Sequence, residues 1–278
     1  MLRGKKTYNF PVIEVCDMRK VLVVFGTRPE AIKMAPVVLE LKKYKGHIKT
    51  IVCATAQHRH MLDQVLSIFK IKPDIDLDLM RKNQTLTTIT VRTLEKIKDV
   101  LKSERPDIVL VQGDTTTAMA VGLESFYQKI PVGHIEAGLR TYDRFNPYPE
   151  ETNRRILSAL AEYHFAPSKN AFDILLKEGT DKRKIFLTGN TSIDALLYIL
   201  RNKKGIKVPV EVKRKLIMVT AHRRENFGRP FEHICRALLK IAQTNEDVEI
   251  VYPVHLNPNV QKPVYKILSR CDRIHLIE

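Results

Sequence analysis

The sequence predicts an α/β protein with two doubly wound domains, the second of them incomplete at its C-terminal end. Short apolar runs alternate with amphipathic segments from Val21 onward, which is typical of parallel sheets covered by helices. About seven such runs precede Thr188, enough for a complete doubly wound domain, whereas about three follow it. We therefore expect an N-terminal extension over residues 1–18, a first domain over 19–188 and a partial second domain over 189–278.

The first predicted strand and helix lie in residues 21–36. Residues 21–25 form a continuous apolar run, as expected of a strand that is buried on both faces. Thr27 and Glu30 then stand at the spacing of a capping box, which predicts a helix that ends at Gly46. Arg28 and Lys33 lie at the start of this helix, where cations oppose the helix dipole. A bound anion would offset that cost; the alternative is that both side chains point into water.

The remaining elements follow in order along the chain. Strands are predicted over residues 51–54, 75–79, 108–111, 163–166 and 185–187, and a further strand opens at Pro131 and ends in HIEAG. Helices are predicted over 61–69, 85–102, 118–127 and 151–162. After residue 188, strands are predicted over 216–220, 248–252 and 274–277, with a helix over 231–242. The charged segment 201–215 is predicted to be a surface connection.

Composition narrows the class of protein. The net charge is +16, but the Lys and Arg residues are spread along the chain without a recognisable nucleic-acid-binding module. Attraction to a phosphorylated small substrate fits this charge as well, and we expect no nucleic-acid partner. No apolar stretch approaches the ~20 residues that span a bilayer, and the N-terminus does not resemble a secretory signal. We therefore expect a cytoplasmic protein with no membrane partner.

Neither a metal nor an organic cofactor is predicted. The four cysteines are far apart, which indicates reduced thiols rather than disulfides or a zinc site. His58 and His60 have no nearby pair of carboxylates, so a metal site is not favoured there. The sequence contains neither GxGxxG nor GxxxxGK[ST], so dinucleotide cofactors and P-loop hydrolysis are not indicated.

Charged residues gather where the predicted strands end. Ligands of parallel sheets bind beyond the carboxyl ends of the strands. The residues at these positions are Arg28, Lys33, Asp114, Glu136, Glu150 and His222. Asp114 has the alternative of a helix cap, and Glu150 that of a first-turn residue favoured by the helix dipole. Glu136 follows an apolar strand, where a buried carboxylate needs a partner.

Eight longer motifs stand in order along the chain: FGTRPEAIKMAP, TAQHR, GDTTT, HIEAGLRT, PEETNRR, TGNTSIDAL, HRRENFG and YPVHLNPNV. In these motifs the chain resembles the non-hydrolysing UDP-N-acetylglucosamine 2-epimerases. The resemblance implies two Rossmann-like domains in the arrangement of B-type glycosyltransferases, with substrate between them. It also implies a homodimer without a cofactor. Family members continue beyond the part that matches this chain, through a segment that binds uridine diphosphate.

The resemblance implies a reaction and a set of roles. UDP is eliminated from UDP-N-acetylglucosamine to give a 2-acetamidoglucal, and its return gives UDP-N-acetylmannosamine, a precursor of cell-surface polysaccharide or glycan. Asp114, Glu136 and Glu150 are the implied acid and base candidates. The implied groups around the diphosphate are Arg28, Lys33 and His222, and His222 is also implied as a catalytic residue because it would offset the charge that develops there. Asp114 and Glu136 are implied to lie beside the substrate.

A second, regulatory site is also implied by the family pattern. Gln57, His58 and His255 resemble its residues, whereas His60 and Asn83 depart from that pattern. His255 has the alternative of a structural histidine. Other functions remain open at this stage: a glycosyltransferase of the same fold, a hydrolysing epimerase that releases free N-acetylmannosamine, and a catalytically impaired, truncated homologue that binds nucleotide sugars.

Overall fold

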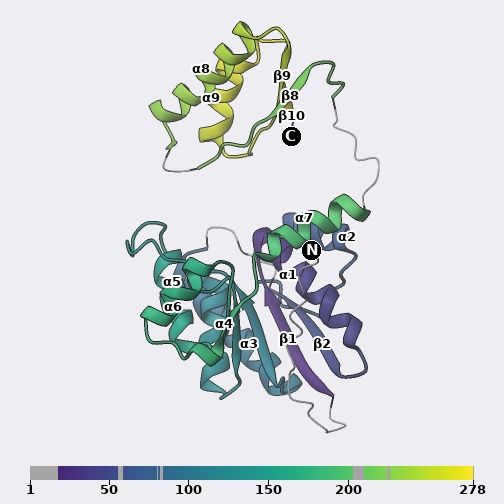
Figure 1. Ribbon diagram of the computed structural model, residues 1–278, viewed down its shortest axis with the longest axis vertical. Coiled ribbons are helices and arrows are strands. Elements are labelled where there is room, and N and C mark those ends of the chain that lie inside the picture. Colours follow the sequence, from purple (N-terminus) through teal and green to yellow (C-terminus); the bar gives the residue numbers. More distant parts are fainter. Residues whose placement is uncertain are drawn as a thin grey trace, which may run out of the picture. The chain divides into compact units, whose positions relative to one another are not determined.

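The computed structural model describes residues 18–55, 59–79, 81, 84–202, 210–223 and 226–277. Contacts within the chain divide it into two compact units, the first ending at Asn202 and the second beginning at Lys203 (Figure 1). Each unit has its own sheet and its own core.

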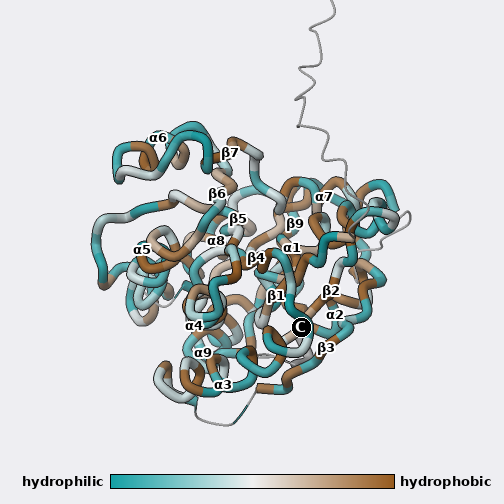
Figure 2. The backbone as a smooth tube through the Cα atoms, turned by 90° about the horizontal axis from the view of Figure 1, so that it is seen from below, coloured by the Kyte–Doolittle hydropathy of each residue, from teal (hydrophilic) through white to brown (hydrophobic). Residues whose placement is uncertain are grey.

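The first unit is built on a seven-stranded sheet in the order β3-β2-β1-β4-β5-β6-β7. Every strand is parallel to its neighbours, as the sequence predicted. The labels of these strands follow one another across the sheet in Figure 2. The strands are β1 (Arg19–Phe25), β2 (Ile48–Ala54), β3 (Ile75–Asp76), β4 (Ile108–Gln112), β5 (Val132–Ile135), β6 (Tyr163–Ala166) and β7 (Ile185–Leu187). The strand order reverses between β1 and β4, and such a switch point is where ligands of doubly wound sheets bind.

In the part of this unit that the structure describes, six α-helices connect successive strands, and a seventh follows the last strand. They are α1 (Arg28–Leu41), α2 (Arg59–Phe69), α3 (Leu86–Glu104), α4 (Thr116–Tyr127), α5 (Glu150–Leu160), α6 (Lys169–Lys177) and α7 (Thr191–Asn202). The predicted capping box of Thr27 and Glu30 is present at the start of α1. The prediction that α1 reaches Gly46 is wrong, because the chain leaves α1 at Leu41 and forms a 3₁₀ turn before that glycine.

Strand β1 is buried on both faces, as its apolar run predicted. Val21, Val23 and Phe25 belong to the core that α1 and α2 cover. Leu22 and Val24 belong to the opposite core, with residues of α3, α4 and α5. This central strand therefore holds the turn after Phe25 in a fixed place, and that turn carries the first candidate residues.

Helix α7 belongs to the first unit. Ala195 of this helix is buried in the core that includes α1, and the ring of Tyr198 lies 5.1 Å from that of Phe69. The contacts of the chain therefore divide it after α7, whereas we expected the first domain to end at residue 188. The sequence pattern marks where β7 ends, but it does not show that the next helix folds back onto α1.

The second unit has a three-stranded parallel sheet in the order β10-β9-β8. Its elements are β8 (Lys215–Met218), α8 (Arg229–Thr244), β9 (Val248–Pro253), α9 (Pro258–Leu268) and β10 (Ile274–Ile277). Helices α8 and α9 pack together against one face of the sheet (Figure 1). On β8, Leu216 and Met218 are exposed. Among the described residues, no helix has the length and apolarity that a membrane crossing requires.

Candidate functional site

Glu136 lies at the centre of a cluster formed by four elements of the first unit. It follows β5, and its Oε2 lies 2.5 Å from Nζ of Lys33, on α1. Gln112, the last residue of β4, donates a hydrogen bond to the same oxygen. Asn190, which follows β7, donates to Oε1 at 3.3 Å. The expectation that this carboxylate has a partner is therefore met, by one cation and two amides.

The backbone at Glu136 supports a functional role. Its φ is +65°, a left-handed conformation that few residues other than glycine adopt. Such strain costs ~1–3 kcal/mol and is found mostly at sites where a side chain must be held in one place. The side chain is only 11% exposed. The carboxylate is thus fixed and mostly withdrawn from water at the carboxyl edge of the sheet.

Asp114 belongs to a neighbouring turn, directly after β4. Its Oδ2 accepts a hydrogen bond from Nε of Arg154, on α5, at 2.7 Å. The alternative that Asp114 caps a helix is wrong, because the cap of α4 is Thr115, whose hydroxyl accepts from the backbone N–H of Ala118. The Asp114 carboxylate is therefore not used by the helix and is partly exposed.

Glu151, rather than Glu150, stabilises the loop before α5. Its side chain is fully buried and accepts hydrogen bonds from the backbone N–H groups of Thr141 and Tyr142 and from Arg154. Burial alone would raise the pKa of Glu151, but these hydrogen bonds hold it below its usual value. Glu150 is half-buried in the first turn of α5, and within the described residues no hydrogen bond or ion pair joins it to Asp114 or Glu136.

Glu30 connects the turn that carries Arg28 to the turn that carries Asp114. Its Oε2 accepts from the N–H groups of Gly26 and Thr27, and its Oε1 accepts from the hydroxyl of Thr115 at 2.7 Å. Burial raises the pKa of Glu30. Arg28 itself is exposed, and no hydrogen bond or ion pair engages it in the part of the chain that the structure describes.

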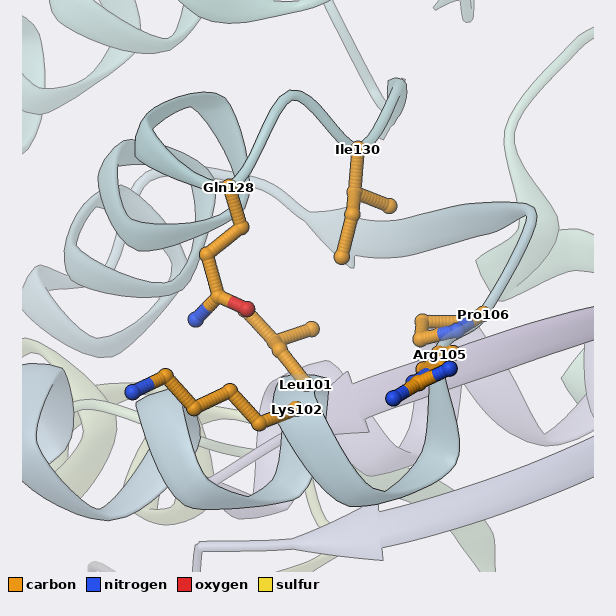
Figure 3. A pocket seen from close by; sticks show the side chains of 6 residues that line it. All are labelled: Leu101, Lys102, Arg105, Pro106, Gln128 and Ile130. Carbon is orange, nitrogen blue, oxygen red and sulfur yellow. The ribbon is translucent and has the colours of Figure 1, made fainter.

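The first unit also has a shallow hollow, which lies at the opposite ends of the strands from the candidate site. Figure 3 shows its lining, which comes from the end of α3 and from the residues that precede β4 and β5. The lining residues are Leu101, Lys102, Arg105, Pro106, Gln128 and Ile130. Because the hollow lies at the amino ends of β4 and β5, it is separate from the candidate site at their carboxyl ends.

His222 and His255 lie together in the second unit, although the family pattern assigns the first to the diphosphate and the second to a regulatory site. The rings of His222 and His255 are stacked, with centroids 5.1 Å apart and planes 14° from parallel. Nδ1 of His255 accepts a hydrogen bond from the backbone N–H of Asn257, which supports the alternative that His255 is a structural histidine. Gln57 and His58, the other two residues of the expected regulatory site, lie outside the described residues.

Comparisons with known proteins identify the family. A family model described as UDP-N-acetylglucosamine 2-epimerase matches residues 39–278. The UDP-N-acetylglucosamine 2-epimerase of Salmonella typhimurium is 54% identical over 269 residues, which cover 93% of this chain and 71% of that protein. The chain belongs to the UDP-N-acetylglucosamine 2-epimerase family. The family resemblance and the fold class predicted from the sequence are therefore confirmed.

Solved structures of epimerases agree with this assignment. The enzyme from Neisseria meningitidis, solved bound to UDP-GlcNAc, has a TM-score of 0.87 and 51% identity, and the match covers 93% of this chain and 72% of that one. An epimerase from Methanocaldococcus jannaschii, in complex with UDP-GlcNAc and UDP, has a TM-score of 0.76 and 31% identity over 93% of this chain and 73% of that one. The epimerases are isomerases that act on carbohydrates, and this chain is one of them.

Three side chains that bind the candidate carboxylates were not predicted from the sequence of this epimerase. Gln112 and Asn190 bind Glu136, and Arg154 binds Asp114, yet none of the three was singled out. Gln112 and Asn190 occupy or closely follow strand ends, so the rule that selected Glu136 would also have found them. Arg154 lies within α5, where only the strand order places it beside the turn after β4.

Two buried histidines of the epimerase lie side by side on β5 and β6. His134 and His164 are paired in the register of these strands, and Nδ1 of each ring is buried without a hydrogen-bond partner in the described residues. Burial lowers the pKa of both rings from 6.5 to about 4, and nearby cations, Arg140 among them, contribute in the same direction. Both imidazoles are therefore neutral in the folded protein over a range of pH in which free imidazoles become charged.

We expect the free energy of unfolding to fall as the pH is lowered from about 6.5 toward about 4. Unfolding exposes both imidazoles, which then bind protons that the folded state does not accept. Each histidine contributes up to about 1.4 kcal/mol per pH unit in this window. Urea unfolding of the wild type and of His164→Gln at several pH values measures the effect. His47→Gln, a change at an exposed histidine, is the control. A pH dependence that His164→Gln leaves unaltered would contradict the prediction.

Proposed function

We propose that this epimerase interconverts UDP-N-acetylglucosamine and UDP-N-acetylmannosamine by eliminating UDP and adding it back. The electrons of the C2–H bond form the C1–C2 double bond, and those of the C1–O bond leave with UDP. The return of UDP and of a proton on the other face of C2 gives the epimer, so no redox partner is needed. The Neisseria meningitidis relative, which was solved bound to UDP-GlcNAc, supports this choice of substrate.

The carboxylates of the first unit are the proposed acid and base groups. Asp114 and Glu136 follow the carboxyl ends of β4 and β5, where substrate binds in doubly wound sheets, and Glu150 begins the helix that follows β5. Inversion requires proton removal from one face of C2 and proton delivery to the other, which favours two carboxylates over one. The observation that most strongly supports this proposal is the fixed position of Glu136, with Lys33 at 2.5 Å.

Arg28, Lys33 and His222 are the proposed diphosphate-binding residues. Arg28 is exposed at the start of α1, where the helix N-terminus also favours an anion. Lys33 would contact both the diphosphate and Glu136, so that one cation stands between the base and the departing group. Negative charge on the departing UDP would then be stabilised by positioned donors, which is the usual source of large rate effects.

The remaining expectations belong to the same proposal. The enzyme would be a cytoplasmic homodimer that binds UDP-N-acetylglucosamine and UDP without an organic cofactor or a metal. Its product would supply polysaccharide or glycan synthesis. Gln57, His58 and His255 would form the regulatory site for a second substrate molecule.

Incubation with UDP-N-acetylglucosamine in deuterated water tests the reaction. We expect deuterium at C2 of the sugar and accumulation of UDP-N-acetylmannosamine, because re-addition takes its proton from solvent. Sugar transfer to an acceptor without deuterium at C2 would instead identify a glycosyltransferase. Free N-acetylmannosamine would identify a hydrolysing epimerase. Binding of UDP with neither exchange nor product would identify a nucleotide-sugar-binding protein and overturn the proposal.

A further inference from the structure

The turn that carries Asp114 is held at each of its three residues by a different element. Nε2 of His134, on β5, lies 2.7 Å from the carbonyl oxygen of Gly113. Nδ2 of Asn153, on α5, donates to the carbonyl oxygen of Asp114 at 2.9 Å. The hydroxyl of Thr115 donates to Oε1 of Glu30, on α1, at 2.7 Å. We call residues 113–115 the Asp114 turn.

The three groups that hold the Asp114 turn are shielded from water. His134, Glu30 and Asn153 are 0%, 2% and 5% exposed, respectively. Water cannot readily replace a hydrogen bond at such positions, and a bond in this low-dielectric surrounding is stronger than one at the surface. The Asp114 turn is therefore restrained on three sides before any substrate arrives.

Stability alone does not account for these side chains. A buried imidazole with one unpartnered nitrogen is disfavoured relative to an apolar side chain of similar size, and Nδ1 of His134 has no hydrogen-bond partner in the described residues. The other ring nitrogen, Nε2, is hydrogen-bonded to the carbonyl oxygen of Gly113. Glu30 needs only Oε2 for the capping box of α1, yet its Oε1 reaches Thr115 of another helix cap. Both residues thus make a contact to the Asp114 turn that their local structure does not require.

The carboxylate of Asp114 is fixed in turn by a separate pair. Arg154 binds its Oδ2 at 2.7 Å and also binds the buried Glu151 at 2.8 Å. The backbone and the side chain of Asp114 are therefore restrained by two different side chains of α5. Proton transfer depends steeply on such placement, since a shift of ~1 Å can lower a rate ~10²-fold.

We propose that His134, Asn153 and Glu30 are positioning residues, which hold the Asp114 turn so that the carboxylate meets the substrate at C2. This inference rests on the proposed function. None of the three needs to touch the substrate. Their loss should lower kcat rather than weaken substrate binding.

A matched pair of variants at His134 tests the proposal. His134→Gln places an amide nitrogen near the position of Nε2 and can still donate to Gly113, whereas the shorter side chain of His134→Asn places its nitrogen near Nδ1. We expect His134→Asn to lower kcat ~10²-fold with little change in KM for UDP-N-acetylglucosamine or in UDP affinity. His134→Gln should keep most of kcat. Calorimetry with UDP and thermal unfolding of both variants separate misplacement from loss of folding.

A second pair at Thr115 decides the question if the His134 variants do not fold. Asn and Asp both cap helices well, so either replacement preserves the start of α4. Thr115→Asn can still donate to Glu30, but Thr115→Asp sets a second carboxylate against it. We expect Thr115→Asp to lower kcat far more than Thr115→Asn does.

The outcomes distinguish this inference from the proposed function. If Asp114→Asn is inactive while the two members of each pair show equal kcat, the positioning role is overturned and the proposed reaction stands. If Asp114→Asn keeps full turnover, the proposed role of Asp114 fails, whatever the variants at His134 and Thr115 do. A parallel loss of UDP affinity and kcat would indicate a merely structural role and would also overturn the inference.

Discussion

Asp114→Asn is expected to lower kcat by ~10²–10⁴-fold while UDP still binds, because general acid–base groups contribute factors of this size. The amide oxygen of asparagine can still accept the hydrogen bond from Arg154, so the turn should keep its conformation. What is lost is a group that exchanges a proton. Steady-state epimerisation and the rate of deuterium incorporation at C2 measure the effect, and calorimetry measures UDP affinity.

Glu136→Gln should cause a loss of similar size, with a second cause added. Glu136 accepts from the amides of Gln112 and Asn190, and the NH₂ group of a glutamine would face one of these donors. Asp173→Asn is the control, because Asp173 lies on the surface of α6 and, among the residues that the structure describes, pairs only with Lys169 of the same helix. Wild-type turnover in both Asp114→Asn and Glu136→Gln would exclude the two carboxylates from the mechanism.

Gly26→Ala is expected to lower the free energy of unfolding of the first unit by ~1–3 kcal/mol, the usual cost of overpacking a filled interior. A Cβ atom at this position would lie 2.2 Å from Oγ1 of Thr55, a distance that no relaxed contact allows. Thr55 directly follows β2 and is fully buried, so its hydroxyl would have to be displaced within a close-packed interior. The change would also displace the turn that carries Arg28.

Thermal and urea unfolding of Gly26→Ala measure this destabilisation. Gly46→Ala is the matched control, since a Cβ there would have no neighbour within 4 Å. The double variant with Thr55→Ala should recover much of the lost stability, because the hydroxyl that causes the clash is removed. If Gly26→Ala and Gly46→Ala unfold alike, the turn after β1 is less closely packed than the distances indicate.

The alternation of strands and helices, and the charged residues at strand ends, could be predicted from the amino-acid sequence. The double-sided burial of β1 followed from five consecutive apolar residues, and the start of α1 from the capping-box spacing of Thr27 and Glu30. Asp114 and Glu136 were selected because ligands of parallel sheets bind beyond the carboxyl ends of strands. These are local or general rules, so no knowledge of the strand order was needed.

The contacts between side chains of the candidate site could not be predicted, because they depend on how the strands are ordered in the folded sheet. Lys33 and Glu136 are 103 residues apart in the chain, and Glu30 and Thr115 are 85 apart. Each pair meets because β1 lies beside β4 and β4 beside β5. That order depends on the packing of whole helices across both faces of the sheet, which local periodicity does not encode. The same physical reason places α7 in the first unit, beyond the boundary expected at residue 188.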